Sequence, residues 1–173
     1  MLFRSRHHSA TEALLADSGV AWTSLRNGFY AHSLDWLLGP WRETGAIAAP
    51  ADGPVSWTER ADAAEAAAVI LASDGDYDGP VALTASAAPT LAEIAGIASE
   101  LTGRDIERVV LDDDEWVAQQ VAEGTPETAA RFLLGFYQAA REHRFAATDP
   151  LLGELLGREP RPVRDLLADR VAA

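Results

Sequence analysis

The residues best suited to chemistry gather in one short segment, Leu25-Arg26-Asn27-Gly28-Phe29-Tyr30. Asn27 is the only asparagine in the chain, and its amide offers both a donor and an acceptor. Gly28 would let a ligand approach the backbone, while Phe29 and Tyr30 offer flat apolar surface. The segment directly follows a predicted strand, and open α/β sheets bind ligands at strand ends. From chemistry alone, a turn carrying two core aromatics explains the segment equally well.

Two other groups of residues could bind a metal ion, but both are incomplete. Asp74 to Gly79 matches the first half of a calcium-binding EF-hand loop, yet the twelfth position is Ala85 where a bidentate Glu is required. His7 and His8 stand at the start of a predicted helix, and His8 precedes Glu12 by one helical turn. Because neither group has a full ligand set, we predict a solvated turn in the first case and no metal site in either.

Composition excludes several classes of protein. The chain of 173 residues has 27 acidic and 14 basic residues and no cysteine, and all of the basic residues are arginine. A net charge of −13 argues against nucleic acid and anionic membrane as partners. The sequence lacks Gly-x-Ser-x-Gly, Gly-x-Gly-x-x-Gly, Walker and Tyr-x-x-x-Lys patterns. With neither a secretory signal nor a long apolar run, we expect a cytoplasmic protein.

Start and stop signals predict alternating helices and strands, and hence an α/β fold with more helix than strand. Ser9 with Glu12, Thr90 with Glu93 and Asp112 with Glu115 read as capping boxes. Thr58 is expected to cap a long Ala-rich helix, and residues 45–54 are expected to form a loop. Strands are predicted at 20–25, 81–84 and 106–111, and further helices at 34–38, 125 onward and in two pieces after 149.

Several segments together resemble the NmrA-like branch of the atypical short-chain dehydrogenases, of the NAD(P)H-dependent quinone oxidoreductase and triphenylmethane reductase type. They are His8-Ser9-Ala10-Thr11-Glu12, the segment from Trp22 to Tyr30, Val55 to Ala64, and Val81-Ala82-Leu83-Thr84-Ala85 followed by Thr90 to Ala95. The resemblance covers nearly the whole chain. It implies the C-terminal portion of a Rossmann-like NAD(P)-binding fold, helix-rich with a small mixed sheet, and lacking the N-terminal glycine-rich βαβ half.

The resemblance also implies roles for individual residues. Asn27, Gly28, Phe29 and Tyr30 match the loop that lines the nicotinamide and substrate pocket in this family, which makes NADP or NAD the expected cofactor. Tyr30 and Trp36 are the expected contacts of a planar, quinone-like substrate, although core packing would also explain Trp36. The glycine-rich turn that holds the pyrophosphate in the family is absent from this sequence.

Two functions follow as alternatives, for a single domain over residues 1–173. The first is an oxidoreductase that passes hydride to a quinone-like acceptor. The second is a non-catalytic module that senses dinucleotides or contacts other proteins, and a remnant without function is a third possibility. Because the strand at 20–25 would be central in the complete family sheet, we expect an exposed edge and either self-association or a missing N-terminal half as partner.

Overall fold

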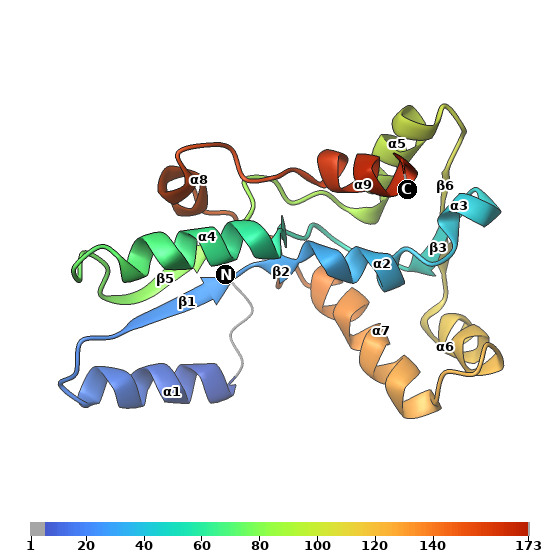
Figure 1. Cartoon of the computed structure of the whole chain (residues 1–173). Coiled ribbons are helices and arrows are strands. Elements are labelled where there is room, and N and C mark those ends of the chain that lie inside the picture. The colour runs from blue at the N-terminus through green and yellow to red at the C-terminus, as the bar shows by residue number, and fades with distance from the viewer. Residues whose placement is uncertain (1–5, 173) are drawn as a thin grey trace.

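The computed structural model describes residues 6–172 and shows an elongated, helix-rich molecule built on short strands (Figure 1). In chain order the elements are α1 (Arg6–Asp17), β1 (Thr23–Asn27), β2 (Phe29–Tyr30), a 3-10 turn (Ala31–Ser33), α2 (Leu34–Leu37), α3 (Trp41–Thr44), β3 (Ala46–Pro50), β4 (Trp57–Thr58), α4 (Arg60–Leu71), β5 (Gly79–Leu83), α5 (Leu91–Thr102), β6 (Glu107–Leu111), α6 (Asp113–Ala122), α7 (Glu127–Arg141), α8 (Leu151–Leu156) and α9 (Val163–Ala172).

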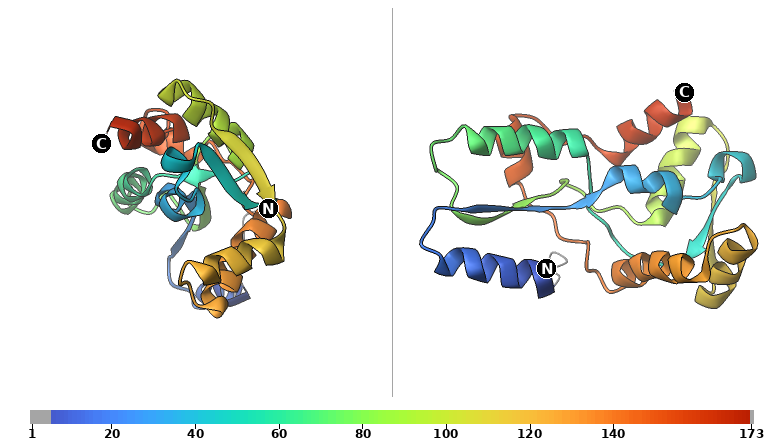
Figure 2. Two further views of the ribbon diagram at one scale, coloured as in Figure 1. Left: turned by 90° about the vertical axis from the view of Figure 1, so that its right-hand side faces the viewer. Right: turned by 60° about the horizontal axis from the view of Figure 1, so that its bottom comes forward.

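The described strands form three pairs, and all of them are parallel: β1 with β5, β2 with β4, and β3 with β6. The expected α/β architecture is confirmed, but the pairing is parallel where we expected a mixed sheet. Each pair joins segments separated by at least one helix, because parallel strands need a crossover connection. The α4 and α8 helices lie on one side of the β1–β5 pair and α1 lies on the other (Figures 1 and 2).

The first strand lies a few residues later than predicted, at Thr23–Asn27, so Asn27 ends the strand and Gly28 follows it. Residues 46–50, which were expected to be loop, form β3 instead. Their small side chains give little sequence signal, but they pair with the β-branched run of β6 and bury Ile47 and Ala49 completely. Tertiary pairing therefore decides the conformation here.

Helix starts were predicted with mixed success. Thr90 and Glu93 form the expected capping box of α5, and Asp112 caps α6. Thr58 does not cap α4, because it lies in β4 and Glu59 takes the capping position. The Ser9 capping box is also wrong, since α1 begins at Arg6 and Ser9 lies inside it. The first helix therefore needs another explanation for Glu12.

Buried side chains form two clusters that hold these elements together. The larger one joins the 3-10 turn, α2, α3, β3 and β4 with parts of α5, α6, α7 and α9. The smaller one, with Ala66, Ile70, Leu83 and Leu152, joins α4, β5 and α8. Trp41 belongs to the core, whereas Trp36 is 43% exposed and so is free to act at the surface. Within residues 6–172 no helix is long and apolar enough to cross a membrane.

Candidate functional site

The segment 27–30 is fixed at the point where β1 passes into β2. The Gly28 amide donates to the Leu83 carbonyl at 2.8 Å, which extends the β1–β5 ladder by one bond. Phe29 and Tyr30 then pair with Trp57 and Thr58 of β4. Backbone pairing on both sides leaves the segment little freedom, so its side chains keep defined directions.

Gly28 is required by a close contact inside the protein. A β-carbon added at this position would overlap Thr58 Oγ1 and lie 3.0 Å from the Ser56 carbonyl oxygen. We expected Gly28 to let a ligand approach the backbone, but β4 occupies the space where its side chain would be. The glycine is therefore required by the close packing of β4 against the segment.

A buried polar cluster lies next to the segment, in and beside β4 and at the end of β5. Ser56, Thr58 and Thr84 are each fully buried. The Thr58 hydroxyl donates to the Ser56 carbonyl at 3.2 Å and accepts from the Ala85 amide at 2.9 Å. Thr84 Oγ1 accepts from the Asp149 amide at 2.7 Å. Since every buried hydroxyl here has a partner, the cluster holds β4, the end of β5 and the chain before α8 in one arrangement.

Asn27 and Tyr30 meet at the exposed side of the segment. The Asn27 side-chain amide donates to the Tyr30 hydroxyl oxygen at 2.9 Å. Neither the Asn27 oxygen nor the Tyr30 hydroxyl hydrogen bonds to another described residue, so both could bond to a ligand in the cavity that these residues line. The sequence predicted both residues in one segment, Asn27 for its amide and Tyr30 for its flat ring, and the fold adds the hydrogen bond between them.

Phe29 lies differently from its neighbours, within a group of aromatic rings. Its ring centroid is 5.4 Å from that of Trp57, 5.4 Å from Phe136 and 4.8 Å from Phe145. The contacts with Trp57 and Phe136 are edge-to-face, the arrangement that aromatic pairs favour. Phe29 is half-buried and anchors the segment, so its role in a ligand site would be to form a wall.

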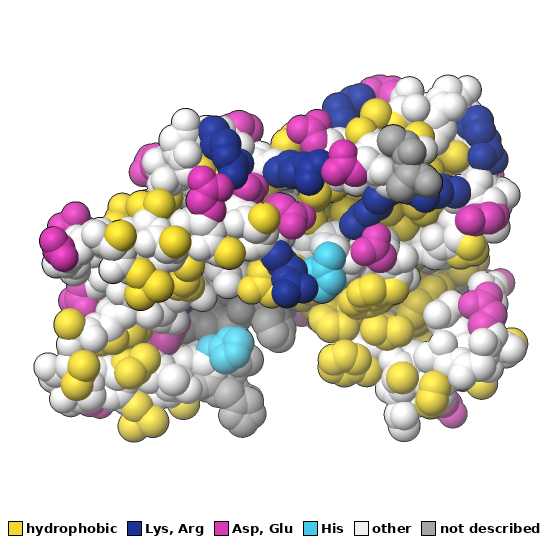
Figure 3. Space-filling view, in the orientation of Figure 1, with side chains coloured by type: hydrophobic (Ala, Val, Ile, Leu, Met, Phe, Trp, Pro, Cys, Tyr) yellow, Lys and Arg dark blue, Asp and Glu magenta, His cyan; other side chains and the backbone are white. Residues whose placement is uncertain are grey.

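An open cavity of about 1080 Å³ adjoins the segment. Figure 3 shows the hollow between the part of the surface formed by α1 and the part formed by α7. All four predicted residues of the segment line it, together with His8, Thr11, Glu12, Leu15, Ser24, Leu25, Arg26, Arg131, Phe132, Gly135, Phe136, Ala139, Arg144 and Phe145. The volume slightly exceeds the roughly 300–1,000 Å³ of typical small-molecule sites, so a ligand would fill only part of this open cavity.

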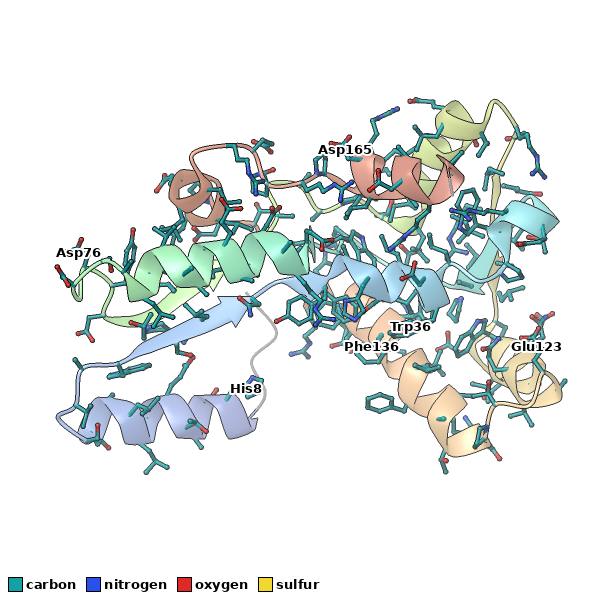
Figure 4. All side chains as sticks on the ribbon, viewed as in Figure 1. His8, Trp36, Asp76, Glu123, Phe136 and Asp165 are labelled. Atoms are coloured by element: carbon teal, nitrogen blue, oxygen red, sulfur yellow. The ribbon has the colours of Figure 1, made fainter. Side chains whose placement is uncertain are left out.

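Trp36 does not belong to the lining of this cavity, but its ring contacts Phe136, which does. Its ring lies 5.8 Å from that of Phe136, and Figure 4 shows the two labelled side chains next to each other. Sequence reasoning did not select Phe132, Phe136, Arg131 or Arg144. The i, i+4 spacing of Phe132 and Phe136 on α7 was a usable signal, but it is equally typical of core packing.

Glu12 of α1 forms the opposite wall of the cavity with Arg26 of β1. Arg26 donates from Nε to Glu12 Oε1 at 2.8 Å and from Nη2 to Oε2 at 2.6 Å, and the Ser24 hydroxyl adds a third bond at 3.0 Å. The hydrogen bonds to Glu12 raise the pKa of Arg26 above its usual value. Glu12 is buried, so it fastens α1 to β1 and is not the end of a capping box.

Among the side chains that the structure describes, no group of three or more His, Asp or Glu residues could hold a metal ion. The turn at 74–79 has left-handed backbone at Asp74 and Gly75, with φ of 51° and 91°. The side chain of His7 lies outside the described residues, and that of His8 lines the cavity.

Parallel strand pairs joined by helical crossovers, with a cavity at the carboxyl end of β1, are typical of a Rossmann-like α/β fold. Solved structures agree. The NADPH-dependent quinone oxidoreductase QOR2 of Escherichia coli, in complex with NADPH, has a TM-score of 0.82 and 26% identity, over 95% of this chain and 58% of that one. The triphenylmethane reductase of Citrobacter sp., in complex with NADP(H), has a TM-score of 0.82 and 27% identity, over 94% and 57%.

Sequence comparison gives the same answer, although no family model matches the chain. An NmrA-like family domain-containing oxidoreductase of Aspergillus flavus is 31% identical over 163 residues, which are 92% of this chain and 53% of the relative. The chain is therefore a homologue of NmrA-like oxidoreductases. It spans a little over half the length of these relatives.

The described residues fit one end of a nicotinamide dinucleotide and not the other. Asn27 and Tyr30 present amide and hydroxyl groups at an open cavity, which suits the carboxamide of a nicotinamide. The pyrophosphate would require a glycine-rich turn at a helix N-terminus, and the sequence has no such motif. The donor set therefore matches the reactive end of the cofactor only.

Proposed function

We propose that this chain forms the acceptor side of an oxidoreductase that transfers hydride from NADPH or NADH to a quinone-like acceptor. One observation carries the proposal: the Asn27–Tyr30 segment, held rigidly at the end of β1, faces a cavity large enough for two flat rings side by side. The homology to NAD(P)H-dependent oxidoreductases supports it.

In this proposal the cofactor supplies the hydride and the protein supplies position. Asn27 and Tyr30 hold the nicotinamide carboxamide, and Phe29 forms the wall against which the ring rests. Tyr30 and Trp36 lie on the substrate side, Trp36 acting through its contact with Phe136. Holding donor and acceptor in one geometry accelerates the reaction because their encounter no longer has to occur by chance.

The test begins with the purified 173-residue chain. Its thermal melt with and without NADPH reports binding, because a ligand of the folded state raises the melting temperature. The decrease in NADPH absorbance with a quinone present then reports turnover. We expect Asn27→Ala to lower kcat/KM about tenfold, the effect of one lost hydrogen bond to the reacting complex.

Asn27 is exposed, so the same substitution is expected to change the free energy of unfolding by less than about 1 kcal/mol. Gln119→Ala, which removes an amide from the exposed face of α6, is the matched control. Equal losses of stability and turnover in Asn27→Ala would mean that the segment is only structural. A shift of the melt without NADPH oxidation would favour the dinucleotide-sensing alternative.

We also propose that the free edge of β1 takes a further strand. Within residues 6–172, β1 has β5 as its only strand neighbour. Parallel sheets are normally covered by helices on both faces, and a strand in their interior has a strand neighbour on each side. The added strand would come from a second copy of this chain or from a segment of the kind that the longer relatives have outside the matched region.

A further inference from the structure

One aromatic side chain of the cavity wall is unusually open to solvent. Phe132 on α7 is 69% exposed, and it is the only exposed phenylalanine among the described residues. It lines the same cavity as Asn27 and Tyr30. An apolar ring on an open wall beside polar groups is what an apolar ligand would require.

Phe132 continues a row of rings that begins at the proposed reaction site. Its centroid is 5.3 Å from that of Phe136, which in turn lies 5.4 Å from Phe29 and 5.8 Å from Trp36. Phe132 and Phe136 are one turn apart on α7, so they face the same way. Gly135 also lines the cavity, and nothing lies within 4 Å of where its side chain would be. The row therefore offers a flat surface with free space in front of it.

Arginine side chains stand at the rim of this wall. Among the described residues that line the cavity, three are arginines, Arg26, Arg131 and Arg144, and one is acidic, Glu12, which is paired with Arg26. Arg131 and Arg144 are ion-paired with acidic residues outside the lining, Arg131 with Glu127 and Asp114 and Arg144 with Glu142. Because these pairs cancel the net positive charge of the wall, an anionic substituent would be recognised here by hydrogen bonds from the exposed guanidinium N–H groups.

We propose that Phe132 and Phe136 form the acceptor wall of the enzyme, and that Arg131 at its rim makes it selective for fused-ring acceptors with a negatively charged substituent. This assignment rests on the proposed function, since it places the acceptor beside the nicotinamide held by Asn27 and Tyr30. In this assignment Phe132 sets the preference for the size of the acceptor, and Trp36 packs against Phe136.

Direct binding tests the wall without the need for turnover. Naphthoquinone sulfonate, naphthoquinone and benzoquinone are titrated into the 173-residue chain, and quenching of tryptophan fluorescence gives each Kd. The protein contains no cysteine for quinones to arylate. Phe132→Ala is expected to weaken both naphthoquinones about fivefold and benzoquinone less than twofold, because a larger ring system loses more stacking. Phe132→Tyr is expected to restore binding.

The charged rim is tested with Arg131→Gln, which should weaken the sulfonate about threefold and leave naphthoquinone unchanged, with Arg131→Lys close to the unaltered protein. Leu71→Ala is the matched control, since Leu71 is 86% exposed at the end of α4 and outside the cavity lining. Because Phe132 is exposed, its variants are expected to fold like the original protein, and the thermal melt checks that they do.

The outcomes separate this inference from the proposed function. If Phe132→Ala binds all three acceptors like Leu71→Ala, or weakens benzoquinone as much as the naphthoquinones, the wall assignment is overturned even when NADPH is oxidised. If the expected discrimination is found and NADPH is not oxidised, the wall stands and hydride transfer by this chain fails.

Discussion

The two sides of the cavity are attached to the molecule in very different ways. The Asn27–Tyr30 side is held by strand pairing, by the buried hydroxyls of Ser56, Thr58 and Thr84, and by edge-to-face rings. The α1 side is fastened to β1 by the ion pair of Glu12 with Arg26, and Leu14 of the same helix is 72% exposed. A rigid wall suits the positioning of reacting groups, whereas an ion-paired helix can move without disturbing the core.

The largest effect is expected at Gly28. Gly28→Ala would push a methyl group into Thr58 and lower the free energy of unfolding by about 2–3 kcal/mol, because the buried contact cannot relax. The thermal melt should fall by about 4–10 °C. Gly96→Ala is the control, since Gly96 lies exposed within α5 with nothing near its side-chain position, and it should stabilise by about 0.5–1 kcal/mol. A Gly28→Ala protein as stable as the original would contradict the picture of a rigid wall.

A smaller and local effect is expected at Glu12. Glu12→Gln keeps the shape but loses the charge, and should weaken the attachment of α1 by about 1–2 kcal/mol, moderated because Arg26 is 30% exposed. Hydrogen exchange should speed up in α1 and stay unchanged in β2 and β4. Glu65→Gln is the control, because Glu65 is 52% exposed and Arg158 keeps its bond to Asp62. Faster exchange throughout the molecule would mean that α1 is part of the cooperative core.

The smallest effect is expected at the free edge of β1. Sedimentation at rising protein concentration should show weak self-association of the chain. Val20, which is 66% exposed just before β1, is a position where Val20→Lys should reduce the associated fraction, with Val171→Lys on α9 as control. A monomer at every concentration would count against the open edge as a binding surface for a second copy.

Local sequence signals predicted much of the fold and little of the site. Thr90, Asp112 and Gly103 act within one helical turn of themselves, so the start of α5, the start of α6 and the end of α5 could be recognised from neighbouring residues. The β3 strand could not, because its alanines become a strand only by pairing with β6. Glu12 was also assigned to the wrong partner, because its partner Arg26 lies in β1, a different element from the helix that carries Glu12.

The sequence alone predicted the class of fold from helix caps and glycine stops, and it showed the resemblance to NmrA-like oxidoreductases. It also predicted the segment from Asn27 to Tyr30 as a candidate site, because this pattern is local. The packing of the folded chain was needed to show that Gly28 makes room for β4, that Asn27 bonds to Tyr30, and that Phe132 and Arg131 line the same cavity. These contacts are distant in sequence: α7 follows the segment by about a hundred residues, and packing between elements brings the two together.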